Sequence, residues 1–156
     1  MLQQQTEEKM VYEKSYGIVP VHEDHGVFLF LLVHEKAGHW GIPKGHPNEK
    51  ESELETARRE FIEETSIVDF QVIEGPSFVE RYCFKNDGVV FDKTVKYFIA
   101  RVPETKVTVD LDEIIGYGWF NYQEALEMVI HEGRKNIIHE AKEYADKYFK
   151  KDYDHR

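Results

Sequence analysis

The order of helix-forming and strand-forming segments predicts an α/β fold, in which helices cover both faces of a mixed β-sheet as an α/β/α sandwich. Short runs rich in Val, Ile, Phe and Tyr are intermixed with amphipathic segments of helical period. The length of 156 residues and the 41% of hydrophobic residues fit one domain with a sizeable core. We see no internal repeat and no linker, so we expect one domain over residues 11–156, preceded by a flexible terminus over residues 1–10.

Each expected strand is an apolar run bounded by turn residues. These runs cover residues 11–22, 27–33, 69–74, 77–85, 91–102, 107–109 and 114–120. Gly75-Pro76 is expected to break the sheet, and Asn86-Asp87-Gly88 is expected to form a turn between two strands.

Two helices are expected near the C-terminal end. Asn121 can cap the first of them, because Glu124 follows three residues later. We expect this helix to continue to about Ile130 and to be broken by Gly133. An amphipathic helix then runs from Asn136 to about Lys151, and its apolar side is expected to pack against the core.

A further helix is expected near the middle of the chain, and it carries the candidate functional residues. Ser52 is its expected N-cap, with Glu55 three residues later as in a capping box. Leu54, Ala57 and Phe61 recur at helical spacing and predict one buried face.

The neighbouring face of this helix is acidic, because Glu60, Glu63 and Glu64 share it with Glu53. Carboxylates three and four residues apart repel one another by a few tenths of a kcal/mol per pair. Mg²⁺ prefers clustered hard oxygen ligands and would reverse that repulsion. Arg59 can hold one carboxylate through a bidentate pair. The alternative for the acidic run alone is a solvated helix face.

The whole pattern favours the first interpretation, because its spacing is that of a known motif. Written as G-x5-E-x7-R-E-apolar-x-E-E-x-x-apolar, the stretch resembles the Nudix box of the Nudix hydrolases. The matching residues are Gly45, Glu51, Arg59, Glu60, Phe61, Glu63, Glu64 and Ile67. Ser66 departs from the glycine that is usual there. A left-handed conformation after the helix would cost a serine about 1 kcal/mol.

The resemblance implies a Nudix-type α/β/α sandwich and a hydrolase that cleaves a nucleoside diphosphate linked to another group, with Mg²⁺ or Mn²⁺ as cofactor. It implies that Glu63 and Glu64 are metal ligands and that the backbone carbonyl of Lys44 is another. Glu60 is a ligand, the base that takes a proton from water, or both. Outside the motif, Glu113 is a further candidate ligand, and the alternative for it is an ordinary loop carboxylate.

Three residues of the motif are expected to support this chemistry. Arg59 orients Glu60 or its neighbours and belongs with Glu60 and Glu63 to the expected catalytic group. Glu51 braces the loop or holds a further cation. Gly45 is a structural residue of the motif.

Segments around the motif indicate the substrate. The run HWGIPKGH at residues 39–46 resembles the HW-x-x-PKGH run of the asymmetric diadenosine tetraphosphate hydrolases, and the segments at 81–82 and 93–98 resemble paired strands of that group. By this resemblance Tyr82 stacks on an adenine ring and Lys93 contacts a phosphate. Base stacking is worth about 1–3 kcal/mol.

His39, Lys44 and His46 are further candidates to bind the polyphosphate. The alternative for the two histidines is a role in positioning their loop. Related enzymes that act on RNA 5′ ends share parts of this run, so the substrate is less well specified than the motif.

The net charge of −10 disfavours binding of long nucleic acid or of an anionic membrane through the general surface. The single Cys83 excludes an internal disulfide and predicts a cytoplasmic location. The longest apolar run, Val27 to Val33, cannot span a bilayer. The sequence does not indicate the oligomeric state.

We therefore expect a small nucleotide or dinucleoside polyphosphate as the molecule bound. The leading hypothesis is asymmetric cleavage of diadenosine tetraphosphate to ATP and AMP. The alternatives are the same chemistry on an RNA 5′ end, ADP-ribose, a nucleotide sugar or an oxidised nucleotide, and a nucleotide-binding module without catalysis.

Overall fold

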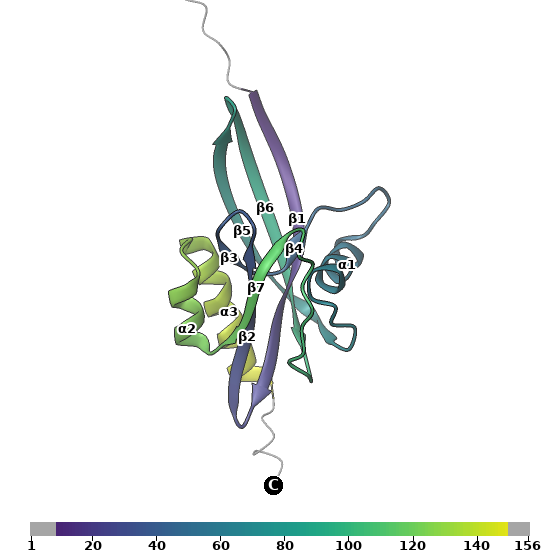
Figure 1. Ribbon diagram of the computed structural model, residues 1–156, viewed down its shortest axis with the longest axis vertical. Helices are drawn as coiled ribbons and strands as arrows, with labels where there is room; N and C mark the ends of the chain where they lie inside the picture. Colours follow the sequence, from purple (N-terminus) through teal and green to yellow (C-terminus); the bar gives the residue numbers. More distant parts are fainter. Residues whose placement is uncertain (1–8, 150–156) are drawn as a thin grey trace, which may run out of the picture.

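The computed structural model describes residues 9–149, in which helices lie on both faces of one twisted sheet (Figure 1). The strands are β1 (Lys9–Asp24), β2 (Val27–Glu35), β3 (Trp40–Gly41), β4 (Lys44–Gly45), β5 (Gln71–Asn86), β6 (Val89–Arg101) and β7 (Ile114–Phe120). The helices are α1 (Glu53–Thr65), α2 (Tyr122–Met128) and α3 (Glu132–Tyr148). None of the helices among these residues is long and apolar enough to cross a membrane.

The sheet is mixed, as expected. Its order is β3-β2-β1-β6-β5, with β4 paired to β1 and β7 paired to β2. Strand β1 runs parallel to β6 and antiparallel to β2 and β4. The alternation of side chains along each strand therefore supplies two apolar faces, and each face needs a covering layer.

Two cores result, which confirms the α/β/α sandwich. Helices α2 and α3 cover one face, where the buried residues include Val19, Phe30, Leu32, Tyr97, Ile99, Ala125, Ile137 and Ile138. Helix α1 covers the other face, with Ile18, Leu31, Ala57, Phe61, Phe70 and Ala100. The motif helix thus lies on the opposite side of the sheet from the C-terminal helices.

Three strands extend beyond the helices. Figure 1 shows the ends of β1, β5 and β6 leaving the body as a narrow ribbon. We call residues 9–14, 81–86 and 89–94 the projecting ribbon, since they pair only with one another in register.

The strand boundaries differ in part from the sequence predictions. Residues 9 and 10, assigned above to a flexible terminus, begin β1, and residues 1–8 lie outside the described part of the chain. Gly75-Pro76 does not end a strand, because β5 continues through it with a shift of register between Val72 and Ser77. Asn86-Asp87-Gly88 does connect β5 to β6, but both strands are longer than expected.

The predicted strand over residues 107–109 is wrong. Its backbone pairs with the end of α1 instead of a strand, because the Thr108 N–H donates to the Thr65 carbonyl at 2.9 Å.

Gly133 does not break a helix either. It lies in the first turn of α3, where a Cβ atom would come within 2.9 Å of a Glu80 carboxylate oxygen. A glycine there permits close packing of helix against strand. The expected C-terminal end of α3 near Lys151 lies outside the described residues, and the observed helix ends at Tyr148.

Candidate active site

Local signals fix both ends of α1. The Ser52 hydroxyl accepts a hydrogen bond from the Glu55 N–H at 3.1 Å, as an N-cap does. At the other end Ser66 is left-handed, with φ 60° and ψ 15°, and its N–H donates to the Ile62 carbonyl. The Ser66 hydroxyl also donates to the Thr108 carbonyl at 2.9 Å. That bond offsets part of the cost of a left-handed serine, roughly 1 kcal/mol.

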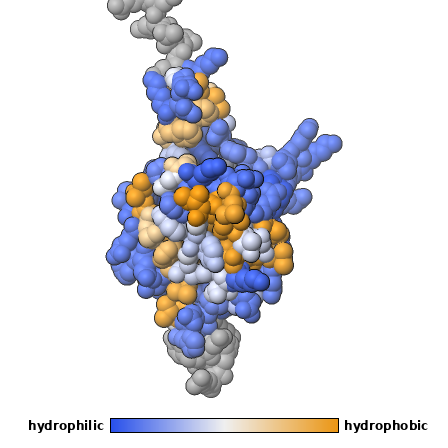
Figure 2. Space-filling view, viewed as in Figure 1, coloured by the Kyte–Doolittle hydropathy of each residue, from blue (hydrophilic) through white to orange (hydrophobic). Residues whose placement is uncertain are grey.

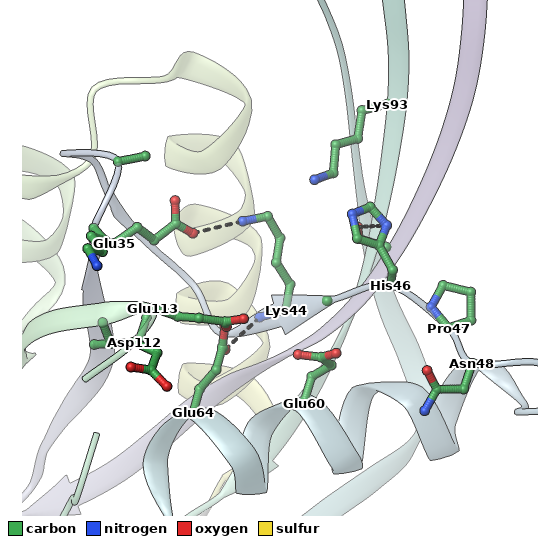
Figure 3. Close-up of a pocket in the computed structure, with 15 residues that line it drawn as sticks. Glu35, Lys44, His46, Pro47, Asn48, Glu60, Glu64, Lys93, Asp112 and Glu113 are labelled. Carbon is green, nitrogen blue, oxygen red and sulfur yellow. Dashed lines mark hydrogen bonds and ion pairs between the residues drawn. The ribbon is translucent and has the colours of Figure 1, made fainter. Parts of the chain in front are cut away.

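The buried face of α1 carries Ala57 and Phe61, as expected. This packing turns Glu60 and Glu64 towards a cavity beside the helix (Figure 3). Glu63 does not line that cavity. Its side chain is half exposed and pairs with Arg59 at 3.2 Å. The predicted ligand role of Glu63 stays a prediction.

Arg59 connects the helix to the loop that precedes it. Its Nε and Nη2 donate to the two carboxylate oxygens of Glu51 at 2.7 and 3.0 Å, a bidentate pair. Its Nη1 donates to Glu60 and Glu63, and Nη2 also donates to the His46 carbonyl at 2.8 Å. The hydrogen bonds from Arg59 are the main reason why the pKa of Glu51 lies at about 2. Glu51 is therefore placed to brace the loop.

Gly45 provides the space that Glu60 occupies. A Cβ atom at position 45 would lie 2.0 Å from the Glu60 carboxyl carbon. No larger residue fits there unless the Glu60 side chain leaves the cavity.

Glu64 is a carboxylate held almost out of water, with 6% of its surface exposed. It accepts a hydrogen bond from the Lys44 backbone N–H at 3.1 Å. Burial raises its pKa to about 8; the positive charge of Lys44 opposes the rise, and Glu60, Glu35 and Glu113 add to it. Such a carboxylate has a strong affinity for a positive charge, whether a proton or a metal ion.

These side chains belong to a cavity of about 560 Å³ that is lined by residues of α1, of the strands β1, β2, β4 and β6, and of the loops beside them. In Figure 3, Glu113 extends from the loop before β7 towards Glu64, opposite Lys93 on β6. The predicted site residues that line the cavity are Lys44, Gly45, His46, Glu60, Glu64, Lys93 and Glu113. Residues far apart in the sequence therefore meet here.

Several lining residues were not predicted from the sequence. Glu35 accepts a hydrogen bond from Lys44 Nζ at 3.1 Å, and Asp112 lies next to Glu113. Ser15, Lys36 and Asn48 also line the cavity. The position of Glu35 at the end of an apolar strand could have indicated a site residue, although only weakly. Nothing in the sequence around Ser15 or Asn48 indicates that these residues belong to a site.

The donor chemistry of the cavity fits a divalent cation. Five carboxylates line it, those of Glu35, Glu60, Glu64, Asp112 and Glu113, and hard oxygen ligands are those that Mg²⁺ and Mn²⁺ accept. Within residues 9–149, however, no three His, Cys, Asp or Glu side chains lie close enough together to hold a metal as they stand. A bound cation would have to draw the carboxylates together.

Tyr82 and His39 lie in a second group of side chains that is absent from the lining of this cavity. The Tyr82 ring is nearly parallel to the His131 ring, at 15° and 6.2 Å between centroids. His39 contacts the same His131 ring edge-on at 5.5 Å. His131, at the start of α3, was not predicted, because it carries no recognisable motif.

A buried ion pair fixes this second group. Arg134 Nε donates to the Glu80 carboxylate at 3.2 Å, and both side chains are at most 5% exposed. The Tyr97 hydroxyl donates to the same Glu80 oxygen at 3.0 Å. The Arg134 guanidinium carbon lies 5.5 Å from the centre of the Tyr82 ring. The start of α3 is thereby attached to β5 and β6 beside Tyr82.

Comparison with known proteins identifies the family. The sequence model of the NUDIX domain matches residues 11–141. The chain belongs to the Nudix family.

Its relatives include enzymes of two kinds. The asymmetrical bis(5′-nucleosyl)-tetraphosphatase of Mus musculus is 33% identical over 126 residues, covering 78% of this chain and 83% of the relative. The RNA pyrophosphohydrolase of Bartonella henselae is 32% identical over 112 residues, covering 66% and 65%. A solved C. elegans Ap4A hydrolase in a binary complex has a TM-score of 0.76 at 23% identity, over 87% of this chain and 99% of that one, which shows the shared fold.

The chain is therefore a Nudix hydrolase with homology to the asymmetric diadenosine tetraphosphate hydrolases. Nudix hydrolases generally use a divalent metal and act on small nucleotide substrates. Both properties agree with the carboxylates and lysines that share the cavity.

The buried pair of this Nudix hydrolase gives a first prediction. Glu80→Ala leaves the Arg134 charge buried without a partner, so the free energy of unfolding should fall by about 3–5 kcal/mol. Glu140→Ala, on the exposed side of α3, should change it by less than about 0.5 kcal/mol. Urea unfolding of both variants measures the difference, and equal midpoints would contradict this role of the pair.

Glu64 gives a second prediction. Burial raises the pKa of this carboxyl to about 8 in the metal-free folded state, whereas in the unfolded chain the carboxyl has its ordinary pKa of 4.5. Between these values the folded state binds more protons, so the stability of the metal-free protein should fall as the pH rises from 4.5 to 8. The loss should be on the order of a few kcal/mol and constant above pH 8.

Unfolding midpoints measured against pH with a chelator present test this. Glu64→Gln removes the titrating group, so its stability should vary much less over the same range. A wild-type protein with the same pH profile as Glu64→Gln would show that Glu64 titrates normally.

Proposed function

We propose that this Nudix hydrolase cleaves diadenosine tetraphosphate asymmetrically to ATP and AMP, with Mg²⁺ or Mn²⁺ as cofactor. One observation carries the proposal: a cavity lined by both carboxylates and lysines lies beside an aromatic group. The homology with asymmetrical bis(5′-nucleosyl)-tetraphosphatases supports it. The single cysteine supports a cytoplasmic location for the reaction.

The polyphosphate would lie between the lysines of the cavity and the carboxylates of α1. Lys44 Nζ and Lys93 approach from the sheet, and Glu60 and Glu64 approach from α1 (Figure 3). Burial lowers the pKa of Lys93, and the nearby charge of Lys44 lowers it further. A bound anion would stabilise both lysines in their charged forms. His46 lies on the same lining and can donate to a phosphate oxygen.

Hydrolysis needs one proton acceptor close to the phosphorus that is attacked. The oxygen of a water molecule bonds to phosphorus, the bridging phosphorus–oxygen bond breaks, and the proton of the water passes to a base. Glu60 is the candidate base in this cavity, with Glu64 and Glu113 as metal ligands. Burial raises the pKa of Glu60, and its hydrogen bond with Arg59 opposes that rise.

A bound divalent cation would neutralise the negative charge on the phosphate oxygens and on the leaving group. Glu63 and the Lys44 carbonyl remain proposed further ligands. Arg59 is proposed to keep the Glu60 carboxylate in place through the hydrogen bond at 2.9 Å.

An adenine would stack on Tyr82. The Tyr82 and His131 rings are nearly parallel, but the distance between them is slightly too short for a base to stack between them. A small outward movement of the His131 ring would make room for the base. His39, against the outer edge of His131, is placed to support this ring. Lys93 lies directly opposite Tyr82 in the register of β5 and β6, so the phosphate next to the base would reach it.

The second candidate function is pyrophosphohydrolysis of an RNA 5′ end. The relationship to the RNA pyrophosphohydrolase favours it. The net charge of −10 argues for the dinucleotide instead, because phosphate contacts from Lys and Arg provide most of the affinity for nucleic acid.

Product analysis tests the proposal. Purified protein with Mg²⁺ is given diadenosine tetraphosphate, 5′-triphosphate RNA, ADP-ribose and an oxidised deoxynucleoside triphosphate in separate reactions. ATP and AMP from the first substrate, at the highest kcat/KM, are the expected result. A higher kcat/KM for RNA or ADP-ribose would overturn the substrate assignment and leave the Nudix chemistry intact.

Glu60→Gln tests the role of the base. Glutamine keeps the hydrogen bond from Arg59 but cannot take a proton, so kcat should fall by about 100-fold or more. Glu55→Gln, which is exposed on the same helix, is the matched control and should keep full activity. A Glu60→Gln enzyme as active as this control would exclude Glu60 as the base.

A further inference from the structure

The projecting ribbon carries a row of apolar side chains that the proposed reaction does not yet use. Phe84 on β5 is paired with Phe91 on β6, which is paired with Val11 on β1. Directly paired residues point to the same face of a sheet, so these three side chains form one row across the ribbon. Phe84 and Val11 are 40% and 39% exposed.

The two phenylalanine rings are stacked on each other, and we call this pair the platform. Their planes are within 10° of parallel and their centroids are 4.9 Å apart. Figure 2 shows hydrophobic residues interrupting the polar surface of the ribbon. Among the described residues, α2 and α3 cover the body of the sheet and do not extend over the ribbon (Figure 1).

The platform continues the candidate active site. Lys93, which lines the cavity, is two residues from Phe91 and therefore on the same face. Tyr82 stands in the same relation to Phe84, with 6.1 Å between their ring centroids. Starting from the cavity, the face thus presents Lys93 and Tyr82 first and then the Phe84–Phe91 platform.

We propose that Phe84 and Phe91 form a second nucleoside subsite, which stacks the base that Tyr82 does not hold. This inference rests on the proposed function, because only a dinucleoside polyphosphate has a second base. The polyphosphate would turn back at the cavity, so that both ends of the substrate meet the same face of the ribbon.

The chemistry of the platform selects a base. Phe91 covers one face of the Phe84 ring, and the other face belongs to a side chain that is 40% exposed on the edge strand β5. A ring face stacks on any nucleobase without reading its hydrogen-bonding edge. Tyr82 and Lys93 separate the platform from the carboxylates, so a group bound there takes no part in the bond cleavage. The subsite should therefore contribute to affinity and not to turnover.

Equilibrium binding to wild-type protein and to Phe84→Ala tests the subsite. Calorimetry with a chelator present, which prevents hydrolysis, gives the Kd for diadenosine tetraphosphate and for adenosine 5′-tetraphosphate, which lacks the second base. Phe84→Ala should weaken binding of the dinucleotide by about five- to tenfold and leave that of the mononucleotide unchanged. Tyr82→Ala should weaken binding of both.

Tyr12→Ala is the matched control, because Tyr12 is an exposed aromatic residue one position along β1 from Val11 and so on the opposite face of the ribbon. It should change neither Kd. Phe84→Leu keeps the apolar bulk that the ribbon needs for folding but removes the aromatic ring, and it should show the same selective loss.

Three results would overturn the subsite: wild-type protein that binds both ligands equally, an equal loss for both ligands in Phe84→Ala, or no loss in either Phe84 variant. A change of oligomeric state in Phe84→Leu, measured by light scattering, with both Kd values unchanged would also overturn it and would assign the platform to contact between copies of the chain. Failure of the proposed function would be seen separately, as absence of ATP and AMP in the product analysis of the wild-type protein.

Discussion

The candidate site depends on the burial of one carboxylate. Glu64 has only 6% of its surface exposed, and a charge in such a place costs several kcal/mol unless positive charge or hydrogen bonds face it. The Lys44 backbone N–H provides one partner. This one hydrogen bond does not compensate for the loss of water around the charge, so the carboxyl of the metal-free protein holds a proton, and burial raises the pKa of Glu64 to about 8. A divalent cation would replace that proton. The burial of Glu64 therefore lowers the stability of the metal-free protein and, at the same time, favours binding of a cation.

The surrounding structure holds the other charges against this carboxylate. Arg59 donates hydrogen bonds to Glu51 and to Glu60, and so connects the loop before α1 to the acidic face of α1. Gly45 allows Glu60 to reach the cavity. On the opposite face of the sheet, the Glu80–Arg134 pair attaches α3 beside Tyr82. Strand β1 pairs with β6 on one side and with β4 on the other, and this brings Lys93 of β6 close to Lys44 and Gly45 of β4.

Much of this followed from short-range patterns in the sequence. The position of α1, its N-cap and its left-handed end at Ser66 depend on residues within a few positions of one another, and the structure has all three. The Nudix family was likewise evident, because the motif is contiguous. Two glycine predictions failed for different reasons. Gly133 lies inside a helix because Glu80 packs against it and leaves no room for a side chain. Gly75 has a positive φ of 109° and lies at the register shift within β5, so it makes the strand irregular without ending it.

Long-range features could not be predicted in this way. Glu35 and Asp112 reach the cavity only because β7 pairs with β2, and His131 meets Tyr82 only because α3 packs on β5. Both contacts join segments that are far apart in the sequence, so the spacing of residues within one segment does not predict them. The sequence placed Glu63 with Glu60 and Glu64, whereas in the structure it pairs with Arg59 on the exposed side.

The central claim is that this cavity binds a divalent cation through Glu64. Calorimetric titration of the wild-type protein and Glu64→Gln with Mg²⁺, and then with Mn²⁺, at pH 7 in two buffers of different ionisation enthalpy tests it most directly. We predict saturable binding to the wild-type protein with release of a proton from Glu64, and much weaker binding without proton release in Glu64→Gln. Equal affinities of the two proteins, or wild-type binding with no proton released, would contradict the claim.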